Sequence, residues 1–173
     1  MYIKPLFIFS FLILFYSCKK TQDPNLGNIV DDNTSGEITK KDLTDLDFIE
    51  FALDSKTEKL VTDWQGYFEL QNLITNVKNG DLSFFNNENN DEIKVLLEDL
   101  KSGVPLDVKS SSTSARILAL ETKLYKLESL STIETTNKKE LVNGIKEFLA
   151  SFSNLNFQMN KKVEKDSREI IKP

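Results

Sequence analysis

Residues 137–163, with the sequence NKKELVNGIKEFLASFSNLNFQMNKKV, carry the most regular helical pattern in the chain. Apolar residues recur there at alternating spacings of four and three, the period of one helix face. They are Leu141, Ile145, Phe148, Phe152, Leu155 and Met159. A second row at spacings of seven lies beside the first and consists of Val142, Leu149, Asn156 and Val163. So wide a stripe predicts a long helix that packs against two neighbours, as in a helical bundle.

The start of this helix is marked by Asn137, with Glu140 three residues later, the pattern of a capped helix N-terminus. A second long helix is expected upstream, after the possible N-caps Ser110–Ser112 and Ser114. Its apolar spine has spacings of three, four and three and consists of Ile117, Leu120, Leu124 and Leu127. These two segments predict neighbouring helices joined by a short polar turn.

A third long helix is predicted from a capping box at Ser55–Glu58 to the Asn79-Gly80 pair, which is typical of a left-handed C-terminal cap. Its apolar face consists of Leu60, Trp64, Tyr67, Phe68, Ile74 and Val77. The loop 81–90 follows, and its Leu82, Phe84 and Phe85 are expected to pack on the body. A short helix over 91–101 then ends at Gly103.

The segment before Ser55 is ambiguous. A capping box at Thr39–Asp42 favours a helix that continues through Leu53, but residues 48–53 are apolar on almost every side. Strict alternation, the strand pattern, extends over only a few residues anywhere in the chain. The sequence therefore predicts an all-α domain over residues 39–173, an antiparallel helical bundle of three long helices and one or two short ones.

The N-terminus has a different pattern. Lys4 precedes an apolar run over residues 6–16, which is shorter than the roughly 20 residues that span a bilayer. Ser17 and Cys18 follow at once, and Cys18 is the only cysteine. This junction resembles a bacterial lipoprotein signal, although Phe15 and Tyr16 replace the usual aliphatic and small residues. The alternatives are an ordinary secretory signal with an incidental cysteine, and an uncleaved anchor.

The resemblance implies a signal peptide over residues 1–17 and lipid attachment at Cys18, which would become the first residue of the mature chain. Residues 18–38 have no apolar period and are rich in turn formers, so they predict a disordered tether behind the anchor. In lipoprotein sorting an Asp after the cysteine retains the protein in the inner membrane, whereas this chain has Lys19. We therefore expect the outer membrane, and its periplasmic face rather than the cell surface.

Composition excludes several function classes. Removal of Lys4 with the signal leaves 21 basic residues against 27 acidic ones, which argues against nucleic acid as a partner. The chain has no His and no second Cys, so it lacks an imidazole base, the common zinc ligands and a disulfide. We expect no enzyme activity and no cofactor. An enzyme that uses only carboxylates or Tyr is the least supported alternative.

Four residues are candidates for ligand binding. Asn156 interrupts an apolar row, so with Asn160 it marks either a ligand pocket, a residue that fixes helix register, or the edge of the stripe. Trp64 and Tyr67, with other aromatics, line either an apolar cavity or an ordinary core. The oxygen-rich run 86–92 resembles a calcium loop in composition, but it lacks the spaced acids and the Gly of an EF-hand.

These observations lead to two functional hypotheses. The first is a lipid-anchored envelope protein whose helical body binds another envelope protein or has a structural role, without catalysis. The second is a carrier that holds a lipid or hydrophobic small molecule in the aromatic core of the bundle.

Overall fold

A computed structural model describes residues 38–44, 46–85 and 91–168, and every regular element in these residues is helical, which confirms the all-α prediction. The elements are α2 (Lys40–Leu43), α3 (Ser55–Leu60), α4 (Gln65–Lys78), the 3₁₀-helix η2 (Ser83–Phe85), α5 (Asp91–Ser102), α6 (Ser111–Thr132) and α7 (Lys138–Asp166). The predicted signal peptide, Cys18 and nearly all of the predicted tether lie outside the described residues.

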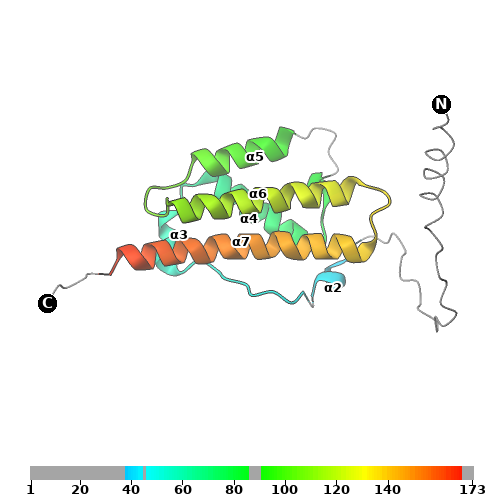
Figure 1. Cartoon of the computed structure of the whole chain (residues 1–173), viewed down its shortest axis with the longest axis horizontal. Helices are drawn as coiled ribbons and strands as arrows, with labels where there is room; N and C mark the ends of the chain where they lie inside the picture. The colour runs from blue at the N-terminus through cyan, green and yellow to red at the C-terminus, as the bar shows by residue number, and fades with distance from the viewer. Residues whose placement is uncertain (1–37, 45, 86–90, 169–173) are drawn as a thin grey trace, which may run out of the picture. The chain divides into compact units, whose positions relative to one another are not determined.

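Helices α6 and α7 form the most extensive helix pair and lie side by side in antiparallel directions (Figure 1). The predicted spines of both helices face the core. Leu120 and Leu124 of α6, and Ile145 and Phe148 of α7, are completely buried. Burial of such side chains stabilises the fold by about 1.5–3 kcal/mol each. The heptad-like spacing of these leucines therefore predicted their inward face correctly.

Both helices begin at N-caps that the sequence offers, Asn137 for α7 and, of the four candidate serines, Ser110 for α6. The Asn137 side chain accepts a hydrogen bond from the Glu140 N–H at 2.8 Å, and the Ser110 hydroxyl accepts one from the Thr113 N–H at 3.0 Å. Each cap satisfies an N–H group that has no partner within its helix. Local side-chain chemistry thus fixes where both helices begin.

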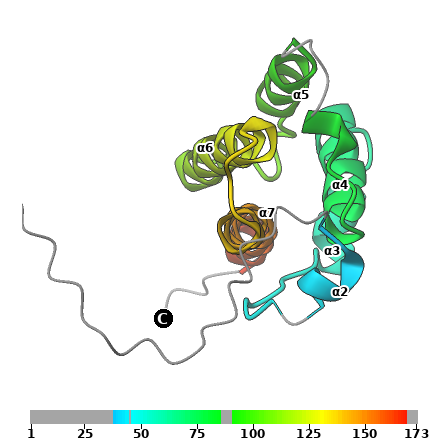
Figure 2. The ribbon, with the colours of Figure 1, turned by 90° about the vertical axis from the view of Figure 1, so that its right-hand side faces the viewer.

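Helices α4 and α5 form a second pair, which is seen beside α6 and α7 when the body is viewed end-on (Figure 2). Gly66 is their point of closest approach. A Cβ atom there would lie 2.3 Å from the backbone nitrogen of Leu100 and 2.5 Å from the carbonyl carbon of Asp99. Only a glycine leaves room for the two backbones at this position.

The C-terminus of α4 is the predicted left-handed cap. Gly80 has φ +85°, its N–H bonds to the Val77 carbonyl at 3.0 Å, and the Asp81 N–H bonds to the Asn76 carbonyl at 3.0 Å. This pair of hydrogen bonds is a Schellman motif. The chain that follows also agrees with the prediction, because Phe85 is buried and Leu82 and Phe84 pack on the core.

The prediction of one continuous helix from Ser55 to Lys78 is wrong. The chain leaves the helix after Leu60 and starts again at Gln65. At the break, Trp64 is buried and its indole N–H donates to the Leu100 carbonyl at 3.1 Å. Leu100 belongs to α5, which is distant from Trp64 in the sequence. Phe68, which was expected on the buried face, is 56% exposed.

A helix through Leu53 is also wrong. The Asp42 carboxylate accepts a hydrogen bond from the Thr39 N–H at 2.8 Å, so the predicted capped start is confirmed. Helix α2 nevertheless ends at Leu43, and residues 46–54 are neither helix nor strand. Residues 86–90, most of the calcium-like run, lie outside the described residues.

Substituting Gly66 by Ala tests the close approach of α4 and α5. We expect Gly66→Ala to lower the free energy of unfolding by about 2–3 kcal/mol, because the new methyl meets rigid backbone. Gly144→Ala on α7 is the matched control. Its methyl would lie 2.6 Å from the flexible end of Leu130, and Ala gains about 1 kcal/mol of helix propensity, so we expect a change within about 1 kcal/mol.

Urea unfolding followed by circular dichroism measures both variants. Equal loss of stability in the two would contradict the assigned role of Gly66.

Candidate functional site

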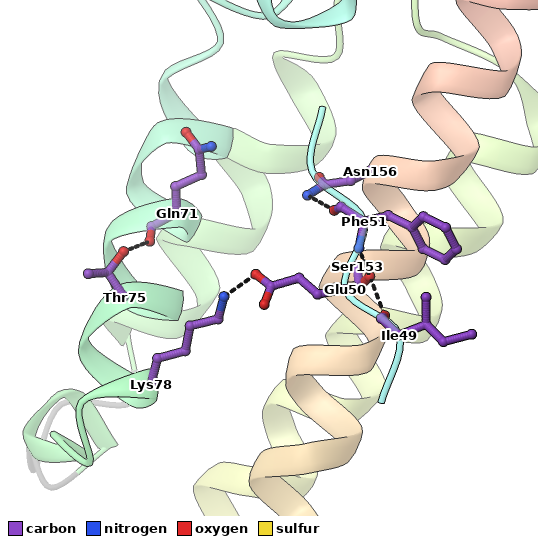
Figure 3. A network of polar contacts seen from close by, with 8 residues as sticks. All are labelled: Ile49, Glu50, Phe51, Gln71, Thr75, Lys78, Ser153 and Asn156. Carbon is purple, nitrogen blue, oxygen red and sulfur yellow. Dashed lines mark hydrogen bonds and ion pairs between the residues drawn. The ribbon is translucent and has the colours of Figure 1, made fainter. Parts of the chain in front are cut away.

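An extended segment lies along α7 in the place where a helix was expected. We call residues 46–54 the strap; Figure 3 shows part of it between α4 and α7. Leu46, Phe48, Phe51 and Leu53 are half-buried, whereas Ile49 is 73% exposed. The strap therefore covers part of the core with some of its side chains and keeps the others in solvent.

Polar side chains of α7 hold the strap by its main chain. The Ser153 hydroxyl accepts a hydrogen bond from the Phe51 N–H at 2.6 Å and donates one to the Ile49 carbonyl at 2.8 Å. The Asn156 amide donates to the Phe51 carbonyl at 3.0 Å (Figure 3). Ser153 and Asn156 are both buried. These bonds replace the partners that a neighbouring strand would offer to an extended chain.

Asn160, one turn further along α7, continues the same row. Its carbonyl oxygen accepts from the Asp54 N–H at 3.1 Å and its amide donates to the Ala52 carbonyl at 2.9 Å. We call Ser153, Asn156 and Asn160 the clasp. Their spacings of three and four put them on one helix face. The contacts also show that the strap runs in the same direction as α7.

Tyr67 joins the clasp to the core. Its phenol donates to the second polar atom of Asn156, the side-chain oxygen, at 2.8 Å. Tyr67 is buried, and this burial raises the pKa of its phenol above the ordinary value, with the nearby charge of Glu58 adding to the effect. The phenol therefore stays protonated and acts as a hydrogen-bond donor.

The Tyr67 ring belongs to an aromatic stack. Its centroid lies 5.3 Å from that of Trp64 and 5.8 Å from that of Phe152, with both pairs stacked. The Trp64 indole N–H has its partner in the Leu100 carbonyl, as described above. Offset aromatic pairs at these distances add about 0.5–1.5 kcal/mol each beyond burial.

The structure thus brings together all four residues that the sequence singled out inside the body. Tyr67 touches Asn156, Asn160 lies one turn away, and Trp64 stacks on Tyr67. Every side-chain polar group of the four has a partner within the chain. Ligand binding by these residues stays a prediction, as does lipid attachment at Cys18, which lies outside the described residues.

Neither Ser153 nor the strap was predicted from the sequence. Ser153 precedes Asn156 by three residues and Asn160 by seven, a polar row inside an apolar helix face. That spacing was the sequence signal that these polar side chains bind one common segment of the chain.

Two ion pairs connect the strap and α2 to the long helices. Lys78 of α4 pairs with Glu50 of the strap (Figure 3). Lys138, the first residue of α7, pairs with Asp42 of α2 at 2.9 Å. Hydrogen bonds from Thr39, the larger cause, and from Lys138 lower the pKa of the Asp42 carboxyl to about 2. The carboxylate is therefore charged at neutral pH.

The described residues contain no group of three or more Asp, Glu, His or Cys side chains that could hold a metal ion. In the same part of the chain, no helix combines the length and the apolar character that crossing a membrane requires. Comparisons with protein-family models, curated proteins and solved structures find no match to this chain.

Replacing Asn156 by Ala tests the clasp. We expect Asn156→Ala to lower the free energy of unfolding by about 2–3 kcal/mol, because the Phe51 carbonyl and the Tyr67 phenol lose their partner at a buried position. Asn154→Ala, an exposed position on the same helix, should change it by less than about 0.5 kcal/mol. Chemical denaturation of both variants gives the comparison, and similar losses would refute a specific role for Asn156.

The Asp42 contacts predict a dependence of stability on acid pH. The folded-state pKa is about 2, below the ordinary value of 3.8, so the stabilisation is present above about pH 4 and is lost as the pH falls towards 2. Asp42→Asn should therefore be less stable than the native chain at pH 7, and the difference should shrink at pH 2.5.

Urea unfolding at pH 7, 4 and 2.5 measures this difference in stability. When both chains also carry Lys138→Gln, the effect of Asp42→Asn at pH 7 should be smaller. A difference that stays constant over this pH range would contradict the assigned contacts.

Proposed function

We propose that this chain is a bacterial envelope lipoprotein, anchored through lipid on Cys18, whose helical body acts without catalysis as a protein-binding or structural module. The observation that carries the proposal is the N-terminal sequence. Lys4 precedes an apolar run that is too short to span a bilayer, and Ser17-Cys18 follows that run directly. The sequence 18–38 then supplies a polar tether between the lipid and the body.

The arrangement of the helices supports the finer part of the proposal. Helices α4, α5, α6 and α7 surround a shared core in the end-on view, as an antiparallel bundle would (Figure 2). Such a body offers long outer faces for a partner. Three large apolar side chains are exposed on these helices, namely Phe68, Val95 and Leu118, and Leu106 and Ile133 are exposed in the connecting segments. The absence of His and of a second Cys from the sequence favours binding over catalysis.

The carrier of a hydrophobic ligand is the second candidate, favoured by the buried aromatic rings. Trp64, Tyr67 and Phe152 stack on one another, so a ligand in the core would have to displace packed side chains. An open groove of about 660 Å³ lies elsewhere and is lined by none of these three residues. This geometry makes protein binding or a structural role the better-supported function.

Cys18→Ala tests the anchor. We expect the native chain to incorporate labelled palmitate and to sediment with membranes, whereas Cys18→Ala incorporates no label and leaves the washed membrane fraction. Ser17→Ala keeps a small residue at the processing site and should behave like the native chain. Labelling in cells and fractionation measure both properties, and membrane-bound, labelled Cys18→Ala protein would overturn the proposal.

Protease treatment of intact and permeabilised cells distinguishes the two faces of the outer membrane. A periplasmic body is cut only after permeabilisation. Cleavage in intact cells would assign the body to the cell surface and its partners to the exterior.

A further inference from the structure

A groove lies between α4 and α5. Its volume is about 660 Å³, within the range of about 300–1,000 Å³ that is typical of small-ligand sites. It is lined by Glu69, Asn72, Leu73 and Asn76 of α4, by Phe84 of η2, and by Asp91, Glu92, Val95 and Leu96 of α5. The groove is separate from the clasp and the aromatic stack.

The groove has an apolar floor. Leu73 and Leu96 belong to the core and are nearly inaccessible, Phe84 is half-buried, and Val95 is 53% exposed. An exposed Val beside a buried Leu on a short helix leaves apolar surface that a ligand can cover. Burial of that surface contributes favourably in proportion to its area.

Among the described residues that line the groove, every charged side chain is acidic. Glu69, Asp91 and Glu92 line it together with two Asn side chains, and no Lys or Arg is among its lining residues. Gln65 donates to the Glu69 carboxylate at 2.8 Å. Lys94 pairs with Asp91 at 3.3 Å, but both side chains are largely exposed, so this pair offsets the charge weakly.

Two other hollows provide a comparison. The hollow of about 310 Å³ beside the strap includes Lys40 and Lys78. The hollow of about 280 Å³ between α6 and α7 includes Arg116 and Lys123. The α4–α5 groove is therefore the largest of the three and the only one of these three without a basic side chain.

The size of the groove limits its occupant. Its lining spans residues 69–76 of α4 and 91–96 of α5, about 10 Å and 8 Å of helix at 1.5 Å per residue. An average helix of 11–12 residues is about 17 Å long and would extend well beyond it. A small molecule fits this length better than a docked helix.

We propose that the α4–α5 groove binds a small amphiphilic organic cation, a protonated or quaternary amine attached to an apolar chain or ring. The carboxylates of Glu69, Asp91 and Glu92 attract the charged group, and the apolar part covers Val95 and the floor. Phe84 adds an aromatic surface of the kind to which such cations are drawn. This inference does not depend on the lipid anchor.

Isothermal titration calorimetry with three probes of equal chain length tests the proposal. The full chain in dodecyl maltoside micelles is titrated with octyltrimethylammonium, octyl glucoside and octanoate, with protein-free micelles as the blank. We expect octyltrimethylammonium to bind with a dissociation constant of about 1 mM or lower, and at least fivefold more tightly than octanoate. Absence of binding above the blank at 5 mM, or tighter binding of octanoate, would overturn the proposal.

Charge variants locate the binding site. Glu69→Gln should weaken octyltrimethylammonium binding about two- to fivefold, and Lys94→Gln, which removes the cation beside Asp91, should strengthen it. Glu98→Gln is the control, since Glu98 is exposed on α5, the helix that carries Asp91 and Glu92, but does not line the groove. Lys94 and Glu98 are exposed and Glu69 is half-buried, so we expect all three variants to keep the fold. An effect of Glu98→Gln as large as that of Glu69→Gln would place the cation elsewhere and refute the groove.

Discussion

Helix α7 packs against α6 and also binds the main chain of the strap, and the rest of the described body depends on these two contacts. One face is apolar and packs against α6, where Ile145 and Phe148 are completely buried. Another face carries Ser153, Asn156 and Asn160, whose hydrogen bonds fix the strap. Because buried polar groups are costly without partners, these side chains and the strap main chain require each other.

Local chemistry determined most of what the sequence could predict about the fold. The caps at Ser110, Asn137 and Gly80 act within a few residues, so local patterns indicated the N-termini of α6 and α7 and the C-terminus of α4. The break before Gln65 depends on a distant partner, because Trp64 donates to the Leu100 carbonyl. The strap was missed for the same reason. Its apolar residues follow neither a helical nor a strand period, and its extended conformation is selected by α7.

The candidate site was predictable in its members but not in its contacts. Tyr67 and Asn156 stand out as polar groups among apolar rows, and they do meet. Their partners include main-chain atoms, which no side-chain pattern specifies. The α4–α5 groove had no sequence signal at all, because Glu69 and Glu92 resemble ordinary solvated residues until the antiparallel pairing brings their helices together.

The direction of the strap has a mechanical consequence. If the chain is held to a membrane through its N-terminus, any pulling force enters the described body through α2 and the strap. Since the strap runs the same way as α7, a pull along that axis loads the clasp bonds in shear and shares the load among them. A pull across the axis instead peels the strap from the Asp42–Lys138 end, one contact after another. The resistance of the body to tension therefore depends on the angle at which its N-terminal end is pulled.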